Sequence, residues 1–431
     1  MSGRTRRRKR RGGLPYLRLV IVLIAVSVAV RWWPRPPVAQ VAAAARIWQI
    51  QSVDTMKTSR DKARAELNNQ AYDAAIEAQV KAIHEVGATH VAVGTPYDDE
   101  FLPYLQRWVR AARRYDLKVW FRGNFARWEG WFDYPKDMSP EEHLAATKTF
   151  IETHAGLFED GDVFDPCPEC ENAGYWPQPE KNSEYNAYLV EQHNAVTAAF
   201  NKIGKNGVTN AFSVIGGRAR EVVDAGTAAS LDHVITIDHY VKDPASFDEY
   251  IGYFAGTLTV QTLLGEFGAP IPDINGGMSD TQQADYVGAV LKKLYHHKND
   301  ILGMNYYVLS EGTTSLLDEN GSPKEVFKLL KSYYRPMIIL GTVTNPLGDV
   351  QKDVTVKTAD GISHTTTTDN GRFSLAVPAM DQTLVIEHAD YFPTEKLVTG
   401  STEKIDTEKI VLEPRHKGFI YNIRSSVKSL L

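Results

Sequence analysis

The chain has 431 residues, 43% of them apolar, and a formal net charge of −5. This length and apolar content suit a large globular domain accompanied by a smaller one. Residues 1–35 contain ten basic residues and no acidic ones, so the remainder is more acidic than the whole chain. Because this acidic remainder has no basic stripe, the composition argues against a nucleic-acid-binding protein.

Residues 1–35 have the pattern of a membrane anchor or an export signal. The basic block Arg4–Arg11 precedes the apolar run Leu19–Val30, and two tryptophans suited to the membrane interface follow. We favour an anchor with a cytoplasmic N-terminus, although the run is shorter than the roughly 20 residues of a full span. The alternative is a cleaved signal, because Val41–Ala45 offers small residues to a signal peptidase. Either interpretation places the rest of the chain outside the cytoplasm.

After a stiff, proline-containing linker at 36–46, residues 47–335 alternate short β-rich runs with helical patterns. Eight such repeats predict a (β/α)8 TIM barrel, an α/β fold whose active site lies at the carboxyl ends of the strands. A doubly wound sheet is the alternative, but no glycine-rich phosphate turn follows the first strand. The expected strands are 47–53, 89–95, 118–123, 162–167, 208–214, 233–240, 259–267 and 301–309.

Two of the intervening helices have clear start signals. Ser139 with Glu142, and Ser279 with Gln282, have the spacing of capping boxes, in which side chains and backbone N–H groups bond reciprocally. These signals predict helices that begin directly after Ser139 and Ser279.

Beyond residue 335 the pattern changes. Residues 336–414 have no helical period, and their short alternating strands, with turns at "PLGD" and "DNG", predict an all-β sandwich. Residues 415–431 form a basic, mildly amphipathic tail. We favour a solvated segment or a helix docked on the sandwich over a surface-binding element.

Polar residues at the ends of the predicted barrel strands are the candidates for chemistry. Glu266 is distinctive because it ends an apolar strand between Gly265 and Gly268, which leave its carboxylate little covered. An acid in such a position is costly unless it is paired or used.

Residues 47–335 resemble the retaining glycoside hydrolases of clan A, most closely family 5. The resemblance rests on "LLGEFGAP" at the seventh strand, an acid after the fourth, and a His-Tyr pair on the sixth. It implies Glu266 as nucleophile, Glu169 as acid/base, and Tyr240 as a hydrogen-bond donor to the nucleophile, with no cofactor. Residues that it marks for substrate binding, or that lie at neighbouring strand ends, are Arg122, Asn124, Asp238, His239 and Tyr306. Arg122 is also a candidate for steadying the nucleophile.

Loop aromatics support a carbohydrate cleft. Trp128 and Trp131 follow the third strand and Trp176 follows the fourth, where flat rings would stack on sugar faces. Aromatic residues in such loops also simply cap barrels, so both interpretations stay open.

The sequence departs from the clan's pattern at two points. Pro168 occupies the position of the asparagine that usually precedes the acid/base, and strand eight lacks the usual tryptophan. Glu171, directly followed by Asn172, is an alternative acid/base. These departures leave a second hypothesis, a non-catalytic surface glycan-binding or scaffold protein with a degenerate barrel.

The only two cysteines, Cys167 and Cys170, flank the predicted acid/base. A zinc site is disfavoured because no second cysteine pair or histidine pair supplies the other ligands, so no metal is expected. In an exported protein the pair is expected as a local disulfide, with unpaired structural thiols as the alternative.

The sandwich sequence resembles carboxypeptidase regulatory-like, transthyretin-like domains. The matching motif is Gly341-x-Val343 followed by Thr368-Asp369-x-Gly371-x-Phe373. The resemblance implies a non-catalytic module for spacing or contacts, with a purely stabilising role as the alternative. Together, the sequence predicts a membrane-anchored, extracytoplasmic retaining glycosidase whose partners are the membrane and a β-linked polysaccharide or cell-surface glycan.

Overall fold

The structure is a computed structural model that describes residues 46–125, 132, 134, 138–173, 182–401 and 404–428. The predicted anchor, most of the linker, and Trp128, Trp131 and Trp176 lie outside these residues. Within the described part of the chain, no helix is both long and apolar enough to cross a membrane.

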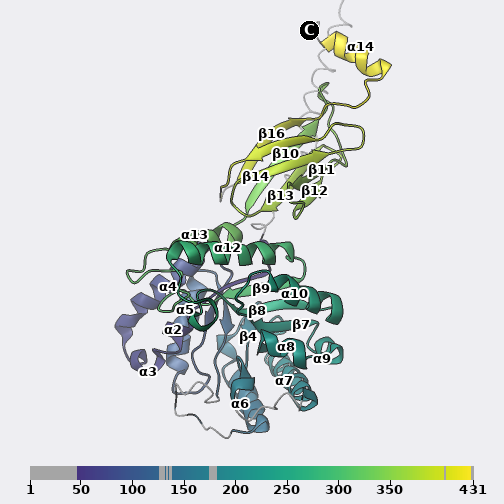
Figure 1. Cartoon of the computed structure of the whole chain (residues 1–431). Coiled ribbons are helices and arrows are strands. Elements are labelled where there is room, and N and C mark those ends of the chain that lie inside the picture. The colour runs from purple at the N-terminus through teal and green to yellow at the C-terminus, as the bar shows by residue number, and fades with distance from the viewer. Residues whose placement is uncertain are drawn as a thin grey trace, which may run out of the picture. The chain divides into compact units, whose positions relative to one another are not determined.

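Nine parallel strands form one curled sheet, drawn at the centre of the lower part of Figure 1. Its two end strands, β5 and β6, are consecutive pieces of one short segment, so the sheet order runs around a closed, barrel-like curl. The predicted barrel-like parallel sheet is therefore confirmed. The strands are β1 (Ile50–Asp54), β2 (His90–Val93), β3 (Lys118–Phe121), β4 (Val163–Phe164), β5 (Thr209–Asn210), β6 (Ser213–Ile215), β7 (Val234–Asp238), β8 (Gln261–Phe267) and β9 (Ile301–Tyr306).

The strands bury side chains on both faces, as parallel strands covered by helices do. Inside the curl, one small apolar cluster contains Ile50, Ala92, Trp120, Val163, Ala211 and Leu263. A much larger cluster joins the outer face of the sheet to the helices. The interior is thus a packed core, and the polar cluster described below lies beyond it, where the strands end.

Helices surround the sheet in Figure 1. The capping boxes predicted at Ser139 and Ser279 are both present, and they start α6 and α12. The principal helices are α4 (Asp73–Val86), α5 (Leu102–Arg114), α6 (Pro140–Thr153), α7 (Asn182–Lys202), α8 (Gly216–Val222), α9 (Ala225–Ser230), α10 (Ser246–Tyr253), α12 (Asp280–His296) and α13 (Glu325–Tyr334). Shorter helical segments are α2 (Met56–Ser59), α3 (Ala63–Glu66) and α11 (Pro272–Asn275).

Two further sheets follow α13, and their apolar faces share one core that includes Val343, Phe373 and Ile386. One sheet contains β10 (Met337–Thr344), β13 (Arg372–Val377) and β16 (Lys404–Val411), with β10 and β16 parallel. The other contains β11 (Thr355–Thr358), β12 (His364–Thr366), β14 (Gln382–Glu387) and β15 (Thr394–Val398).

The basic tail contains a helix, α14 (Phe419–Lys428). Arg424 on this helix donates two hydrogen bonds to the carboxylate of Asp349, in the turn that follows β10. This paired contact favours the docked-helix interpretation of the tail.

Candidate active site

Arg122 is the centre of a polar cluster at the carboxyl ends of the barrel strands. It directly follows β3, and its side chain is fully buried. Its Nη1 donates to Asp54 Oδ2 (2.9 Å) and to Glu266 Oε1 (2.7 Å), while Nη2 donates to Asp238 Oδ2 (3.0 Å). One guanidinium therefore connects three carboxyl groups, from β1, β7 and β8.

Glu266 is fixed through both of its carboxylate oxygens. Arg122 binds Oε1, and Tyr240 Oη donates to Oε2 at 2.6 Å. The ring of Tyr240 meets the ring of Tyr307 edge-on. The Glu266 side chain is 14% exposed, whereas those of Asp54 and Asp238 are buried. Among the three carboxyl groups bound to Arg122, Glu266 is the one that a molecule from solvent can reach.

Asp54 and Asn305 fix the opposite side of the guanidinium. Asp54 accepts hydrogen bonds from Asn305 Nδ2 (2.9 Å) and from the backbone N–H of Met56 (2.5 Å). Asn305 Nδ2 also donates to the carbonyl oxygen of Gly265, beside Glu266. Both Asp54 and Asn305 are strand-terminal polar residues in the sequence, but no motif there marks their role.

Burial and charge act against each other in this cluster. Burial opposes the charge on Arg122, but the surrounding carboxylates outweigh it and raise the pKa of Arg122 well above its usual range. Burial raises the pKa of Asp238 well above its usual range, aided by the charges of Glu266 and Glu169 and opposed by Arg122. Burial likewise raises the pKa of Asp54, against the effect of Arg122 and its other donors.

Gly265 makes room for this arrangement. A Cβ at position 265 would lie 2.2 Å from Asp238 Oδ1 and 2.6 Å from Ser213 Oγ, closer than real atoms approach. The glycine before Glu266 therefore admits a carboxyl and a hydroxyl group into the space under β8. The sequence marks this glycine as a neighbour of Glu266, and the structure gives the reason for it.

Asp165 follows β4 and joins the same region. Its Oδ2 accepts a hydrogen bond from Ser213 Oγ at 2.5 Å, and its carbonyl oxygen accepts one from Tyr97 Oη. Burial raises the pKa of Asp165 to about 6, although Arg122 and Ser213 oppose the change. Asp165 is therefore one of the buried acids near Arg122. Its position in the sequence indicates only a residue of the fourth strand.

The two candidate acid/base residues face different surroundings. The Glu171 carboxylate accepts hydrogen bonds from the N–H of Ile215 (2.5 Å) and from Tyr185 Oη (3.1 Å), and burial raises its pKa. These contacts tie Glu171 to the barrel wall. Glu169 is half-buried, and its charge acts on Asp238 in the polar cluster. Of the two, Glu169 is the one whose charge reaches the groups around Glu266.

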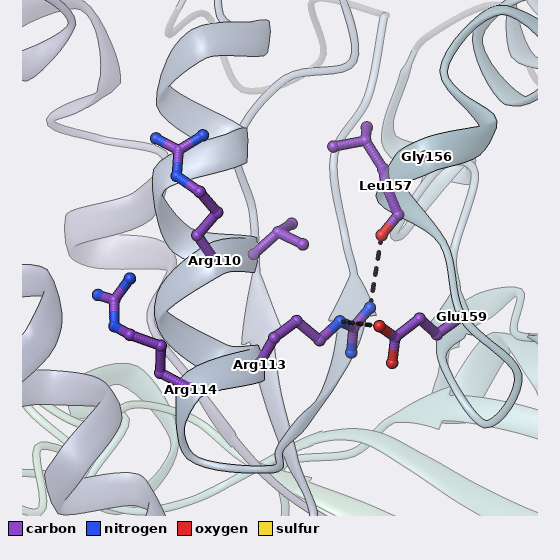
Figure 2. Close-up of a pocket in the computed structure, with 7 residues that line it drawn as sticks. Arg110, Arg113, Arg114, Gly156, Leu157 and Glu159 are labelled. Atoms are coloured by element: carbon purple, nitrogen blue, oxygen red, sulfur yellow. Dashed lines mark hydrogen bonds and ion pairs between the residues drawn. The ribbon is translucent and has the colours of Figure 1, made fainter.

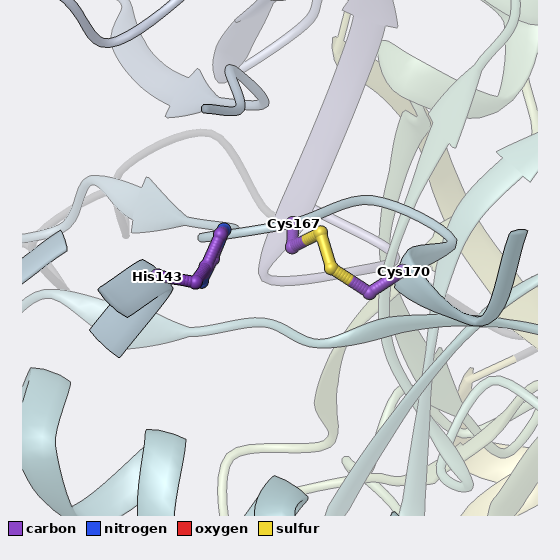
Figure 3. Close-up of side chains that lie close together, drawn as sticks. All are labelled: His143, Cys167 and Cys170. Atoms are coloured by element: carbon purple, nitrogen blue, oxygen red, sulfur yellow. A yellow bond between two sulfur atoms is a disulfide. The ribbon is translucent and has the colours of Figure 1, made fainter. Parts of the chain in front are cut away.

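Cys167 and Cys170 form a disulfide that closes the turn containing Glu169 (Figure 3). Glu169 has a φ of 51°, a left-handed conformation that is uncommon for residues other than glycine, and its N–H donates to Ser213 O at 2.9 Å. His143 lies next to the two sulfurs, and burial lowers its pKa to about 4. Sulfurs bonded to each other are not thiolate ligands, so this trio does not constitute a zinc site while the disulfide stands.

Three of the residues predicted to bind substrate point away from the cluster. On β7 and the residues after it, successive side chains alternate, so His239 faces outward between Asp238 and Tyr240 and packs against Phe247 and Tyr250. Tyr306 is fully buried and donates to the carbonyl oxygen of Thr314. Asn124 Oδ1 accepts a hydrogen bond from the N–H of Phe125 and lies 3.3 Å from His143 Nε2. Tyr307, next to Tyr306, lies at the site instead.

No protein-family model and no curated protein matches the chain. Solved structures with a similar fold include a GH5_18 enzyme from Streptomyces cattleya, in complex with GlcNAc, at a TM-score of 0.51 and 12% identity. That match covers 71% of this chain and 86% of the other. The β-glycosidase BGL167 matches with a TM-score of 0.45 and 12% identity, and the match covers 68% of this chain and 97% of the other. A Bacteroides ovatus GH5 xyloglucanase, in complex with a XXXG heptasaccharide, matches with a TM-score of 0.43 and 14% identity. That match covers 60% of this chain and 67% of the other. The GH5_18 match, whose TM-score exceeds 0.5, shows that the chain has a GH5-like fold.

A separate cavity of about 460 Å³ lies between the end of α5 and the 3-10 segment η2 (Ala155–Leu157), shown in Figure 2. Arg113 spans it, with an ion pair to Glu159 and a hydrogen bond to the carbonyl oxygen of Leu157. Arg113 also binds Asp162, which precedes β4. Asp162 lies at the amino end of that strand, so this cavity is at the other end of the GH5-like barrel from Glu266.

Proposed function

We propose that the protein is a retaining glycoside hydrolase with Glu266 as nucleophile and Glu169 as acid/base. The observation that carries the proposal is the Glu266 carboxylate, which is held through both oxygens by Arg122 and Tyr240 and is partly exposed to solvent. A nucleophilic carboxylate needs this combination of fixed geometry and access to the anomeric carbon. The GH5-like fold supports the same assignment, because these barrels carry their sites at the carboxyl ends of the strands.

Glu169 completes the proposed pair of carboxyl groups. In the first step it would protonate the leaving oxygen while Glu266 attacks, giving a glycosyl–enzyme ester. In the second it would take a proton from water, which then releases the sugar with its original anomeric configuration. Its partial exposure and its electrostatic contact with Asp238 support this role.

The proposed substrate is a β-linked polysaccharide or cell-surface glycan, and the proposed location is the extracytoplasmic face of a membrane. The basic block and apolar run of residues 1–35 support export, and a disulfide suits an oxidising compartment. We propose that residues 336–414 form a non-catalytic transthyretin-like module. The two sheets around one core support this assignment.

The test is the stereochemistry of hydrolysis. The purified chain is incubated with a panel of β-linked oligosaccharides, and proton NMR follows the anomer that appears first. We expect the β-anomer to appear before mutarotation. First appearance of the α-anomer would exclude a retaining mechanism. Binding of an oligosaccharide without cleavage would favour the alternative, a glycan-binding protein with a degenerate site.

A further inference from the structure

The polar cluster beneath Glu266 contains more acids than its one guanidinium can neutralise. Arg122 contacts the carboxyl groups of Asp54, Asp238 and Glu266, and the first two are almost completely buried. Ionised carboxylates in such surroundings are costly unless cations or hydrogen-bond donors compensate them. The charge balance therefore favours a proton on at least one of these acids.

Hydrogen bonds distinguish the three acids. Both oxygens of Asp54 accept hydrogen bonds, and so do both oxygens of Glu266. Asp238 accepts one through Oδ2, from Arg122, but its Oδ1 is buried and has no hydrogen-bond partner among the described residues. A carboxylate oxygen with no donor is the place where a proton costs least.

Asp238 Oδ1 and the hydroxyl group of Ser213 both lie beside Gly265. Both this oxygen and Ser213 Oγ approach the position that a side chain at Gly265 would occupy. Ser213 Oγ in turn donates to Asp165 Oδ2. Ser213 therefore brings a hydroxyl group into the space that Asp238 Oδ1 occupies, and the proton of that hydroxyl is already donated to another acid.

The charged groups around Asp238 are one cation and several acids. Arg122 lowers the pKa of Asp238, whereas burial, Glu266, Glu169 and Asp165 raise it, and the net direction is well upward. His239, its neighbour in sequence, faces the outer layer of helices and does not contribute a charge on this side.

We propose that Asp238 is a positioning residue that carries a proton on Oδ1 at neutral pH. The neutral acid then holds Arg122 through Oδ2 without adding a third negative charge. The guanidinium is left to neutralise Asp54 and Glu266. The assignment of Glu266 as nucleophile rests on the proposed function, whereas the protonation of Asp238 does not.

The first test is the pH dependence of unfolding for the full-length chain and its Asp238→Asn variant, in which an amide replaces the neutral acid with the same shape. Because the folded-state pKa of Asp238 lies above the unfolded value, its stabilising contribution is complete below about pH 4 and is lost as the pH rises toward the folded value. We expect the unfolding constant of the wild type, relative to the variant, to increase about tenfold per pH unit over that range. A ratio that does not change with pH would overturn the proposal.

Asp54→Asn is the matched control. Both Asp54 oxygens accept hydrogen bonds, and an amide nitrogen cannot do so, so this variant is expected to unfold more readily than the wild type at neutral pH. Asp238→Asn is expected to unfold less readily there. Destabilisation of both variants to the same extent at neutral pH would contradict the assignment.

Infrared spectroscopy tests the proposal even where Asp238→Asn fails to fold. The wild-type chain at neutral pH is expected to show a C=O stretching band of a protonated carboxyl group, and this band persists in Asp165→Asn, Asp54→Asn and Glu171→Gln. Absence of the band from the wild type would overturn the proposal, and its loss in any of these three variants would assign the proton to the acid that was replaced. Neither the unfolding measurement nor the infrared spectrum depends on hydrolysis. A wild type that shows the band but hydrolyses no glycoside would therefore refute the proposed hydrolase activity and leave the protonation of Asp238 supported.

Discussion

The strand ends that carry Glu266 and Glu169 are built in opposite ways. Glu266 lies on β8, a seven-residue strand paired with β7 and β9, and buried neighbours fix its carboxylate. Glu169 lies beyond β4, which has two residues, in a turn closed by the Cys167–Cys170 disulfide. Regular strand pairing and the ion pair with Arg122 hold the Glu266 carboxylate. The position of Glu169 depends instead on a disulfide and on its own left-handed backbone conformation. The two sites should therefore respond differently to mutation.

Glu266→Gln is expected to produce the largest loss. Removing a nucleophile lowers hydrolysis by more than about 10⁴-fold, while the isosteric amide leaves oligosaccharide binding measurable by calorimetry. The control is Glu319→Gln, an exposed glutamate between β9 and α13, which is expected to keep full activity. Substantial hydrolysis by Glu266→Gln would remove Glu266 from the chemistry.

Glu169→Gln is expected to lower turnover by about 10²- to 10⁴-fold on natural glycosides, the usual contribution of a general acid. Aryl glycosides with good leaving groups need less protonation, so the turnover of this variant on them is expected to fall less. Glu171→Gln is the matched comparison, and a smaller, leaving-group-independent loss is expected because Glu171 binds Ile215 and Tyr185. The opposite pattern would make Glu171 the acid/base.

Tyr240→Phe removes one hydrogen bond to the Glu266 carboxylate. A hydrogen bond to a charged group contributes about 1.5–3 kcal/mol, which corresponds to roughly a 10- to 150-fold decrease in kcat/KM. Tyr306→Phe is the control, because its hydroxyl binds the carbonyl oxygen of Thr314 in the core. That variant is expected to change the free energy of unfolding and leave kcat/KM near the wild-type value; equal kinetic losses would show that neither contact is specific to the site.

The double variant Cys167→Ser, Cys170→Ser tests the covalent link, with the smallest expected effect. A short disulfide loop is expected to contribute about 2 kcal/mol to the free energy of unfolding. We expect turnover on natural glycosides to fall more than turnover on activated aryl glycosides, because Glu169 is displaced and Glu266 is not. An equal loss on both substrates would mean that the disulfide acts through general stability.

The sequence predicted the regular parts of this molecule well, because they depend on local patterns. The eight β-rich runs and the capping boxes at Ser139 and Ser279 each follow from spacing alone. The Tyr240–Glu266 pair followed from a resemblance to a known motif. The contact of Arg122 with Glu266 was also expected.

The other long-range contacts of the cluster escaped prediction because they depend on how the strand ends meet. Asp54, Asn305 and Ser213 come from three different strands, and only the closed sheet brings them near Arg122. His239 was misplaced as a site residue because alternation beyond β7 turns it outward. Tyr306 and Tyr307 adjoin, and the register of β9 decides which of them is buried.

The most direct test of the central claim is covalent trapping with a 2-fluoro-glycoside. The fluorine slows the second step more than the first, so a retaining enzyme accumulates the glycosyl ester. We predict that mass spectrometry of the digested wild-type protein finds one added sugar on the peptide that contains Glu266. An unmodified Glu266 peptide in a preparation that hydrolyses the parent glycoside would contradict the account.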